Sequence, residues 1–244
     1  MFRHLHREPG FYKRLFLLAL PLILQNLITT SLGFVDTFMV GMLGQNELSA
    51  VTAANTPIYL LQIIILGLLS GLSVLASQYW GRRDMENIHR SVSVAYAMVL
   101  LLTALAALAC LVFPQQIMFL VTDNPDLIPL GAPYLQIVGC SYLFNGFSMV
   151  YLAAQRSMES PKLGMYVLVT SMCLNTLLNY ILIFGKLGLP AMGILGAAWA
   201  TFASRVVEAL ILVLHSFRST LPLQPGRLFH LDRPIFRAFM KYSA

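Results

Sequence analysis

The sequence predicts an all-α polytopic membrane protein built as a bundle of six transmembrane helices. Hydrophobic residues make up 58% of the 244 residues and charged residues only 11%, whereas a soluble domain carries about 25% charged residues. Six apolar runs are long enough to cross the hydrocarbon core, which takes about 20 helical residues. The basic residues gather on one side of these runs. So few charges cannot cover a water-facing surface, so lipid must cover most of the chain.

The six apolar runs follow one another along most of the chain. Each is predicted to be helical, because a lipid-exposed segment must satisfy its own backbone hydrogen bonds. The runs are continuous and do not alternate as the strands of an outer-membrane barrel do. An additional amphipathic stretch at 114–130 is expected to lie at the outer membrane surface. The predicted spans are about 15–40, 51–79, 91–113, 131–155, 163–185 and 195–217.

The loops between the runs carry a strongly uneven charge. The side that holds both chain ends has fourteen basic residues, and the other side has only Lys186. Such an excess is typical of cytoplasmic loops. We therefore expect both termini in the cytoplasm and the protein in the plasma membrane, most simply the bacterial inner membrane. The fourteen are Arg3, Arg7, Lys13, Arg14, Arg82, Arg83, Arg90, Arg156, Lys162, Arg218, Arg227, Arg233, Arg237 and Lys241.

Three segments are predicted from this pattern: a cytoplasmic N-terminus (1–14), the six-helix transmembrane region (15–217) and a cytoplasmic segment (218–244). The tail at 235–244 repeats the order of aromatic, basic and apolar residues seen at 11–20. Transporter folds are often built from repeated halves. We therefore expect residues 218–244 to be a linker between lobes and the start of a second six-helix unit.

Signatures of enzymes and metalloproteins are missing from the sequence. Cys110, Cys140 and Cys173 are far apart, and no CxxC, HExxH, GxSxG or Walker motif occurs. The net charge of +6 arises from loop residues rather than from a basic patch interleaved with aromatics. We therefore expect no catalysis, no cofactor, no metal beyond a possible Na⁺ and no nucleic-acid partner.

Only three ionisable residues lie well inside the predicted spans: Asp36, Arg205 and Glu208. A carboxylate at the membrane centre costs about 2.5–3.5 kcal/mol on the insertion scale. Asp36 is therefore expected to face protein or water rather than lipid. Arg205 and Glu208 are three positions apart on one helix and can form an ion pair.

Four polar side chains are expected at one depth in the outer half of the membrane. Asp36 lies late in the first helix, Asn175 and Asn179 lie one turn apart late in the fifth, and Thr201 lies early in the sixth. Oxygen ligands of this kind suit a hard cation, and the carboxylate could instead take a proton. The alternative is that the asparagines only hydrogen-bond neighbouring helices.

The first helix carries further polar features below Asp36. Pro21 removes an internal backbone hydrogen bond and predicts a kink or hinge. Gln25 and Asn26 either line a polar cavity or hydrogen-bond between helices.

The sequence resembles the multidrug and toxic compound extrusion (MATE) transporters from about Phe11 to Ala244. This resemblance implies a twelve-helix antiporter of two six-helix lobes that exchanges Na⁺ or H⁺ for small organic, often cationic, compounds. The present chain would be the N-terminal lobe. The resemblance rests on ALPLILQN (19–26), VDTFMVGMLGQNELSA (35–50), SQYWGRRD (77–84), RSMESPK (156–162), LNTLLNYILIFG (174–185) and GLPAMGILGAAWATFASR (188–205).

The resemblance assigns roles to several of the residues noted above. Asp36 matches the first-helix carboxylate of the family, Pro21 matches the proline at which that helix bends, and Tyr134 matches a tyrosine near the ion site. The other matches to the N-lobe cation site are Asn175, Asn179 and Thr201. Some members carry a second carboxylate where this chain has Asn179, which leaves the choice of Na⁺ or H⁺ and the stoichiometry open.

Several alternatives remain open at this level. The chain is expected to be a partial sequence that is inactive without a C-terminal lobe, or a half-size protein that dimerises. A flippase for lipid-linked saccharides, from the same superfamily, would need a strongly cationic cavity, and only Arg205 lies deep in a helix. A membrane scaffold that transports nothing is the third possibility.

Overall fold

The computed structural model describes residues 11–158, 162–218 and 233–243, and within these residues it contains helices and no strand. The predicted all-α class is therefore confirmed. The helices are α1 (Phe11–Gly41), α2 (Gln45–Gly81), α3 (Met85–Val112), α4 (Pro114–Val121), α5 (Ile128–Ser157), α6 (Lys162–Phe184), α7 (Ile194–Arg218) and α8 (Arg233–Ser243), with one 3₁₀ turn, η1 (Pro125–Leu127).

Six long helices stand at the six predicted apolar runs. Five of them (α2, α3, α5, α6 and α7) are long and apolar enough to cross a membrane, as judged on the residues that the structure describes. The sixth, α1, is 31 residues long and covers the first run. Helices α2 and α3 begin before their apolar runs, because each starts with a polar turn. This turn carries Glu47 in α2 and Glu86 in α3. Negative side chains are favourable at helix N-termini.

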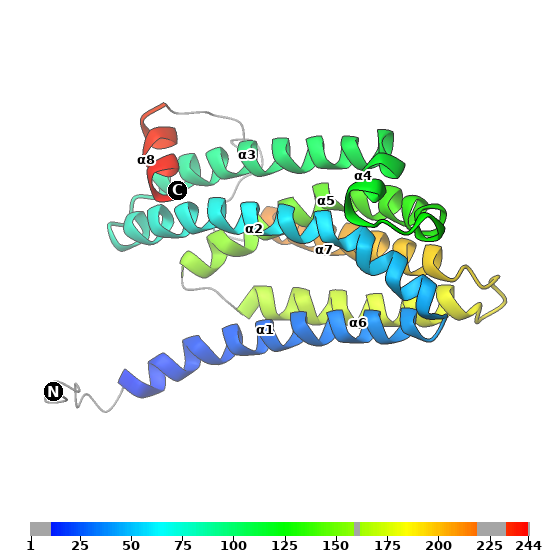
Figure 1. Cartoon of the computed structure of the whole chain (residues 1–244). Coiled ribbons are helices and arrows are strands. Elements are labelled where there is room, and N and C mark those ends of the chain that lie inside the picture. Colours follow the sequence, from blue (N-terminus) through cyan, green and yellow to red (C-terminus); the bar gives the residue numbers. More distant parts are fainter. Residues whose placement is uncertain (1–10, 159–161, 219–232, 244) are drawn as a thin grey trace, which may run out of the picture.

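Helix α5 is the centre of the bundle, since it packs against α2, α3 and α7. Helices α1 and α6 lie side by side along the opposite edge, and α1 makes most of its contacts with α6 (Figure 1). The predicted surface stretch at 114–130 forms α4 and η1 at one end of the bundle. Helix α8 lies at the other end, where α1 begins (Figure 1).

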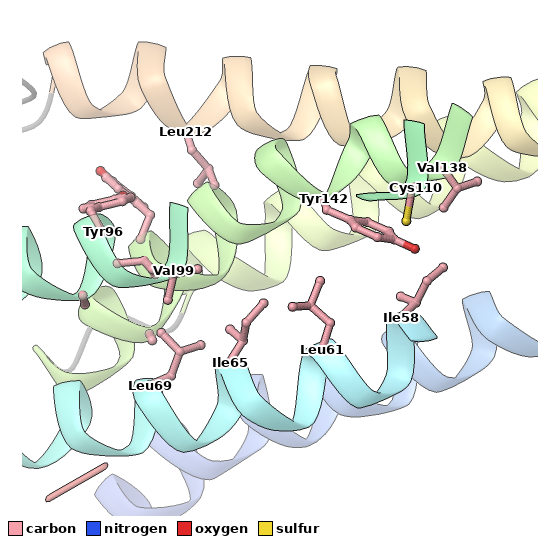
Figure 2. Close-up of a cluster of buried hydrophobic side chains, with 14 of the residues drawn as sticks. Ile58, Leu61, Ile65, Leu69, Tyr96, Val99, Cys110, Val138, Tyr142 and Leu212 are labelled. Atoms are coloured by element: carbon pink, nitrogen blue, oxygen red, sulfur yellow. The ribbon is translucent and has the colours of Figure 1, made fainter. Parts of the chain in front are cut away.

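The apolar core lies between α2, α3, α5 and α7. Figure 2 shows residues of α2, from Ile58 to Leu69, pointing toward side chains of α3 and α5 such as Val99 and Tyr142. In lipid there is little hydrophobic drive between helices, so close packing holds them together. Small residues allow that packing: a Cβ at Gly139 would lie 2.5 Å from the Cβ of Cys110.

Helix α8 is a short amphipathic helix that packs against α2 and α3. Its Ile235 and Phe239 side chains are buried. Residues 219–232 of the predicted linker and residues 1–10 of the predicted N-terminal segment lie outside the described residues. The predicted division into three segments therefore stays a prediction.

The turn after α6 determines how α6 and α7 pack. Helix α6 ends at Phe184, and Gly185 follows with φ of 65°, a left-handed conformation that favours glycine. After the turn, Gly196 lies directly against the backbone of α6. A Cβ at Gly196 would lie 2.6 Å from the carbonyl carbon of Leu182. Glycine therefore allows the start of α7 to lie in contact with the end of α6.

Replacing Gly196 with alanine should push α7 away from α6. The clash is with backbone, so it cannot be relieved by a side-chain rotation, and overpacking typically costs about 1–3 kcal/mol. We expect Gly196→Ala to lower the melting temperature of the purified protein in detergent. Gly81→Ala is the matched control, because nothing lies within 4 Å of a Cβ at Gly81. Equal melting temperatures for the two variants would contradict the close approach.

The loop between α2 and α3 ends in a capped helix. Asp84 is the N-cap of α3 and accepts hydrogen bonds from the backbone N–H of Asn87 at 3.1 Å and from its side-chain amide at 2.6 Å. These hydrogen bonds favour the carboxylate and hold the pKa of Asp84 below its ordinary value of 3.8. The ionised cap therefore stabilises the folded state.

The contribution of this cap should depend on pH. Because the folded-state pKa lies below the unfolded value, the stabilisation is complete above 3.8 and is lost as the pH falls through the folded-state pKa. Asp84→Ala should lower the melting temperature at neutral pH and not at strongly acidic pH. Asp84→Asn should keep a cap that does not titrate. A constant difference between Asp84→Ala and the unmodified protein at all pH values would exclude this role.

Candidate functional site at the junction of α1, α6 and α7

A chain of hydrogen bonds joins three helices where α1 and α6 end and α7 begins. The side-chain amide N–H of Asn179 donates to Asp36 Oδ1 at 2.5 Å and to Asn175 Oδ1 at 3.1 Å. The amide N–H of Asn175 in turn donates to Thr201 Oγ1 at 3.5 Å. The four residues that the sequence placed at one depth are therefore neighbours in space.

The asparagines of this cluster are buried, and Asn179 is incompletely paired. Asn175 is 3% exposed and Asn179 is 1% exposed. The Oδ1 atom of Asn179 has no hydrogen-bond partner among the described residues. A buried acceptor without a partner is costly in free energy. This oxygen belongs to the amide that donates to Asp36, and it has the capacity to bind a cation or accept from water.

A cavity of about 260 Å³ opens beside the cluster and is bounded by α1, α2, α5 and α7. Asp36 and Thr201 line it directly, whereas Asn175 and Asn179 lie behind them. The hydroxyl of Tyr134 donates to Asn55 Oδ1 at 3.5 Å across the cavity wall. The polar side chains that line the cavity are Asp36, Thr37, Thr52, Asn55, Tyr59, Tyr134 and Thr201.

The remaining predicted residues fall into two groups. Tyr134 lines the cavity, as the resemblance implied. Asn26 is exposed and does not line it. The side chains of Pro21 and Gln25 lie outside the described residues, and the backbone of α1 is helical through Pro21. A hinge at Pro21 and a cavity role for Gln25 stay predictions.

Sequence reasoning missed the contribution of α2. Thr52 and Asn55 line the cavity and lie on one face of α2, three positions apart. Asn55 is a polar residue early in the span predicted to run inward, so the sequence predicts it at the same depth as Asp36. Asn175 was predicted from its depth along a helix, and the depth of Asn55 would have predicted it in the same way.

A second polar group lies one turn before Asn175 on α6 and one to two turns after Thr201 on α7. Arg205 Nη1 lies 2.8 Å from Glu208 Oε2, so the predicted pairing is confirmed. The hydroxyl of Ser171 donates to the same carboxylate oxygen at 3.0 Å. Glu208 is 1% exposed, whereas the Arg205 side chain is 24% exposed. The buried negative charge is therefore paired.

The donor atoms at Asp36 fit a hard monovalent cation or a proton. They are one carboxylate, two amide oxygens and one hydroxyl, and oxygen ligands are those that hard cations prefer. Within the residues that the structure describes, no three His, Cys, Asp or Glu side chains come together in a way that could hold a metal ion. A site for a transition metal is therefore not indicated there.

Several known proteins with similar sequences are named as multidrug resistance proteins. The chain is 29% identical to the probable multidrug resistance protein NorM of Rhizobium meliloti over 241 residues, which cover 93% of this chain and 51% of that protein. It is 28% identical to the probable multidrug resistance protein YoeA of Bacillus subtilis, with 89% and 47% covered. The chain spans about half the length of the curated relatives it matches.

Solved structures show the same arrangement of helices. A MATE structure in the straight conformation superposes with a TM-score of 0.78 at 26% identity and covers 93% of this chain and 51% of that chain. A MOP superfamily transporter from Pyrococcus furiosus has a TM-score of 0.80 at 24% identity, which shows the fold alone. The chain covers 50% of that structure. The bundle is therefore one half of this transporter fold.

The MatE family model matches residues 21–181. The match runs from α1 through most of α6 and includes Asp36, Asn175 and Asn179. More than half of the chain is therefore covered by the family model, and the fold agrees with that of solved members. The chain belongs to the MatE family.

Proposed function

We propose that the chain forms one six-helix lobe of a cation-coupled antiporter that exports small organic, often cationic, compounds, and that the Asp36 cluster binds the coupling ion. The observation that carries the proposal is the buried Asn179 amide. It donates to Asp36 and leaves its own Oδ1 unpaired among the described residues. The names of the relatives support multidrug efflux as the activity of the whole protein.

The geometry supplies a way to couple ion binding to shape. Asp36 lies on α1, which makes few contacts outside α6, and its partners belong to α6 and α7. A proton or Na⁺ would neutralise the carboxylate and change the attraction between these helices. A ligand shifts a conformational equilibrium only through such differential contacts. The driving force is an ion gradient, worth about 2.3 kcal/mol per charge for each 100 mV of potential.

The cavity wall carries aromatic side chains that suit an organic cation. Tyr59 of α2 lines the cavity and is 59% exposed. Aromatic faces attract organic cations. We propose that this surface forms one wall of the substrate path and that a second lobe, or a second copy of the chain, supplies the other.

The placement in the membrane follows from the charge of the loops. Residues 15–217 would form the lobe, with residues 1–14 in the cytoplasm and residues 218–244 leading to the second lobe. The excess of basic residues on the side of both termini supports this orientation in a bacterial inner membrane. The packing of α8 against α2 and α3 agrees with a cytoplasmic linker that starts on the lobe itself.

Substitution of Asp36 tests the ion site directly. We expect Asp36→Asn to abolish Na⁺ binding measured by calorimetry and proton uptake measured from the infrared band of a protonated carboxyl group. The amide keeps the shape but cannot carry the charge. Asp126→Asn is the control, because Asp126 is exposed in η1. Undiminished binding of both ions by a folded Asp36→Asn variant would refute the proposal.

The chain by itself is expected not to pump. The relatives are about twice as long as this chain, and in the proposal a second lobe supplies the other wall of the substrate path. A monomeric 244-residue protein in liposomes should therefore show no ion-driven efflux of an organic cation such as ethidium. Efflux by a preparation that cross-linking shows to be dimeric would support the half-size alternative. Efflux by the monomer would contradict the need for a second lobe.

A further inference from the structure

We infer that the Arg205–Glu208 ion pair sets the cation affinity of Asp36, because Glu208 keeps the Arg205 guanidinium from acting as the counter-ion of Asp36. The inference rests on the proposed function, since it concerns the affinity of the same ion site. It assigns Arg205 and Glu208 as positioning residues that act through charge and do not themselves touch the coupling ion.

The ion pair and the Asp36 cluster belong to one polar seam between α6 and α7. On α6, Ser171, Asn175 and Asn179 follow at intervals of four and share one face. On α7, Arg205 lies one turn after Thr201, and Glu208 lies three positions after Arg205. A hydrogen bond joins α6 to α7 at each of two levels. Asn175 donates to Thr201 at one level, and Ser171 donates to Glu208 at the next.

The charges along this seam do not balance. Within the apolar runs of α1, α6 and α7, the charged side chains are Asp36, Arg205 and Glu208. Two carboxylates and one guanidinium leave one unit of negative charge. Charges interact strongly in such a low-dielectric environment. A single monovalent cation, H⁺ or Na⁺, would neutralise the seam.

The position of Arg205 decides which carboxylate needs that cation. Its guanidinium is 2.8 Å from Glu208, and its positive charge also acts on Asp36 at longer range. While Glu208 holds the guanidinium, the two charges of the pair largely cancel at Asp36. Without Glu208, the guanidinium would itself balance Asp36 and compete with the coupling ion. This effect gives a physical reason for a buried carboxylate, which is costly to keep in the membrane.

Other groups around Asp36 do not supply a competing charge. The neighbours on α6 are amides, and Thr201 of α7 is a neutral hydroxyl. Tyr59 of α2 and Tyr134 of α5 also line the cavity, and tyrosines are neutral near physiological pH. Arg205 is therefore the charged group through which the affinity of Asp36 can be tuned.

The test measures the proton affinity of Asp36 in the 244-residue chain in lipid nanodiscs. The infrared carbonyl band of protonated Asp36, identified by its loss in Asp36→Asn, is followed against pH. Glu208→Gln should lower the proton affinity about tenfold or more, the usual effect of an opposite charge nearby. Arg205→Met should raise it, and the double variant Arg205→Met with Glu208→Gln should return it close to that of the unmodified chain. Calorimetric Na⁺ titrations should follow the same order.

The control is Glu86→Gln, which makes the same chemical change in an ion pair at the start of α3, where Glu86 lies 2.5 Å from Arg90. It should leave Asp36 unaffected. A merely structural role for the buried pair predicts lower stability in Glu208→Gln without a change in the affinity of Asp36. An unchanged affinity in the folded Glu208→Gln protein overturns the inference. If that variant does not fold, an unchanged affinity in Arg205→Met overturns it.

These outcomes separate the inference from the function on which it rests. If Asp36 in the unmodified chain shows neither a titrating band nor Na⁺ binding, the proposed function fails. If Asp36 binds its ion with one affinity in all variants, the ion site stands and only the role of Arg205 and Glu208 is lost.

Discussion

A carboxylate that is removed from water must be compensated by its neighbours, and the arrangement of α1, α6 and α7 depends on this constraint. Asp36 receives its hydrogen bond from Asn179, and this bond links α1 to the helix against which it mostly packs. Desolvated charges are expensive in the membrane. The bond therefore favours one position of α1 against α6. An ion that neutralises Asp36 would weaken the preference for that position.

Close packing of α6 and α7 is what completes the cluster. Gly185 allows the chain to turn sharply, and Gly196 brings the backbone of α7 against that of α6. As a result Thr201 and Asn175 come within hydrogen-bond distance. The same packing brings Ser171, one turn before Asn175 on α6, to Glu208 of α7. These two glycines have no functional side chain, but the packing that they allow positions both hydrogen bonds between α6 and α7.

The helices of the bundle differ in how they are held in place. Helices α2, α3, α5 and α7 share the apolar core around Leu61, Val99 and Tyr142 (Figure 2). Helix α1 adds few contacts to that core and is held largely through α6 and the polar cluster. Interfaces that depend on few contacts are the ones that open at low free-energy cost. A cation bound at Asp36, as we propose, would therefore act on the least firmly attached of the six long helices.

The sequence by itself determined the class of fold, the six apolar runs, the common level of Asp36, Asn175, Asn179 and Thr201 along the bundle, and the ability of Arg205 to pair with Glu208. These properties are local, because they depend on the length of an apolar run and on the period of the helix. It did not determine that α2 contributes Asn55 to the cavity, or that Asn26 lies away from it. Tertiary structure decided these points, along with the hydrogen bond between Asp36 and Asn179. The rotation of each helix about its axis follows from the packing of small residues such as Gly196 against another backbone, and no periodicity within one helix specifies that partner.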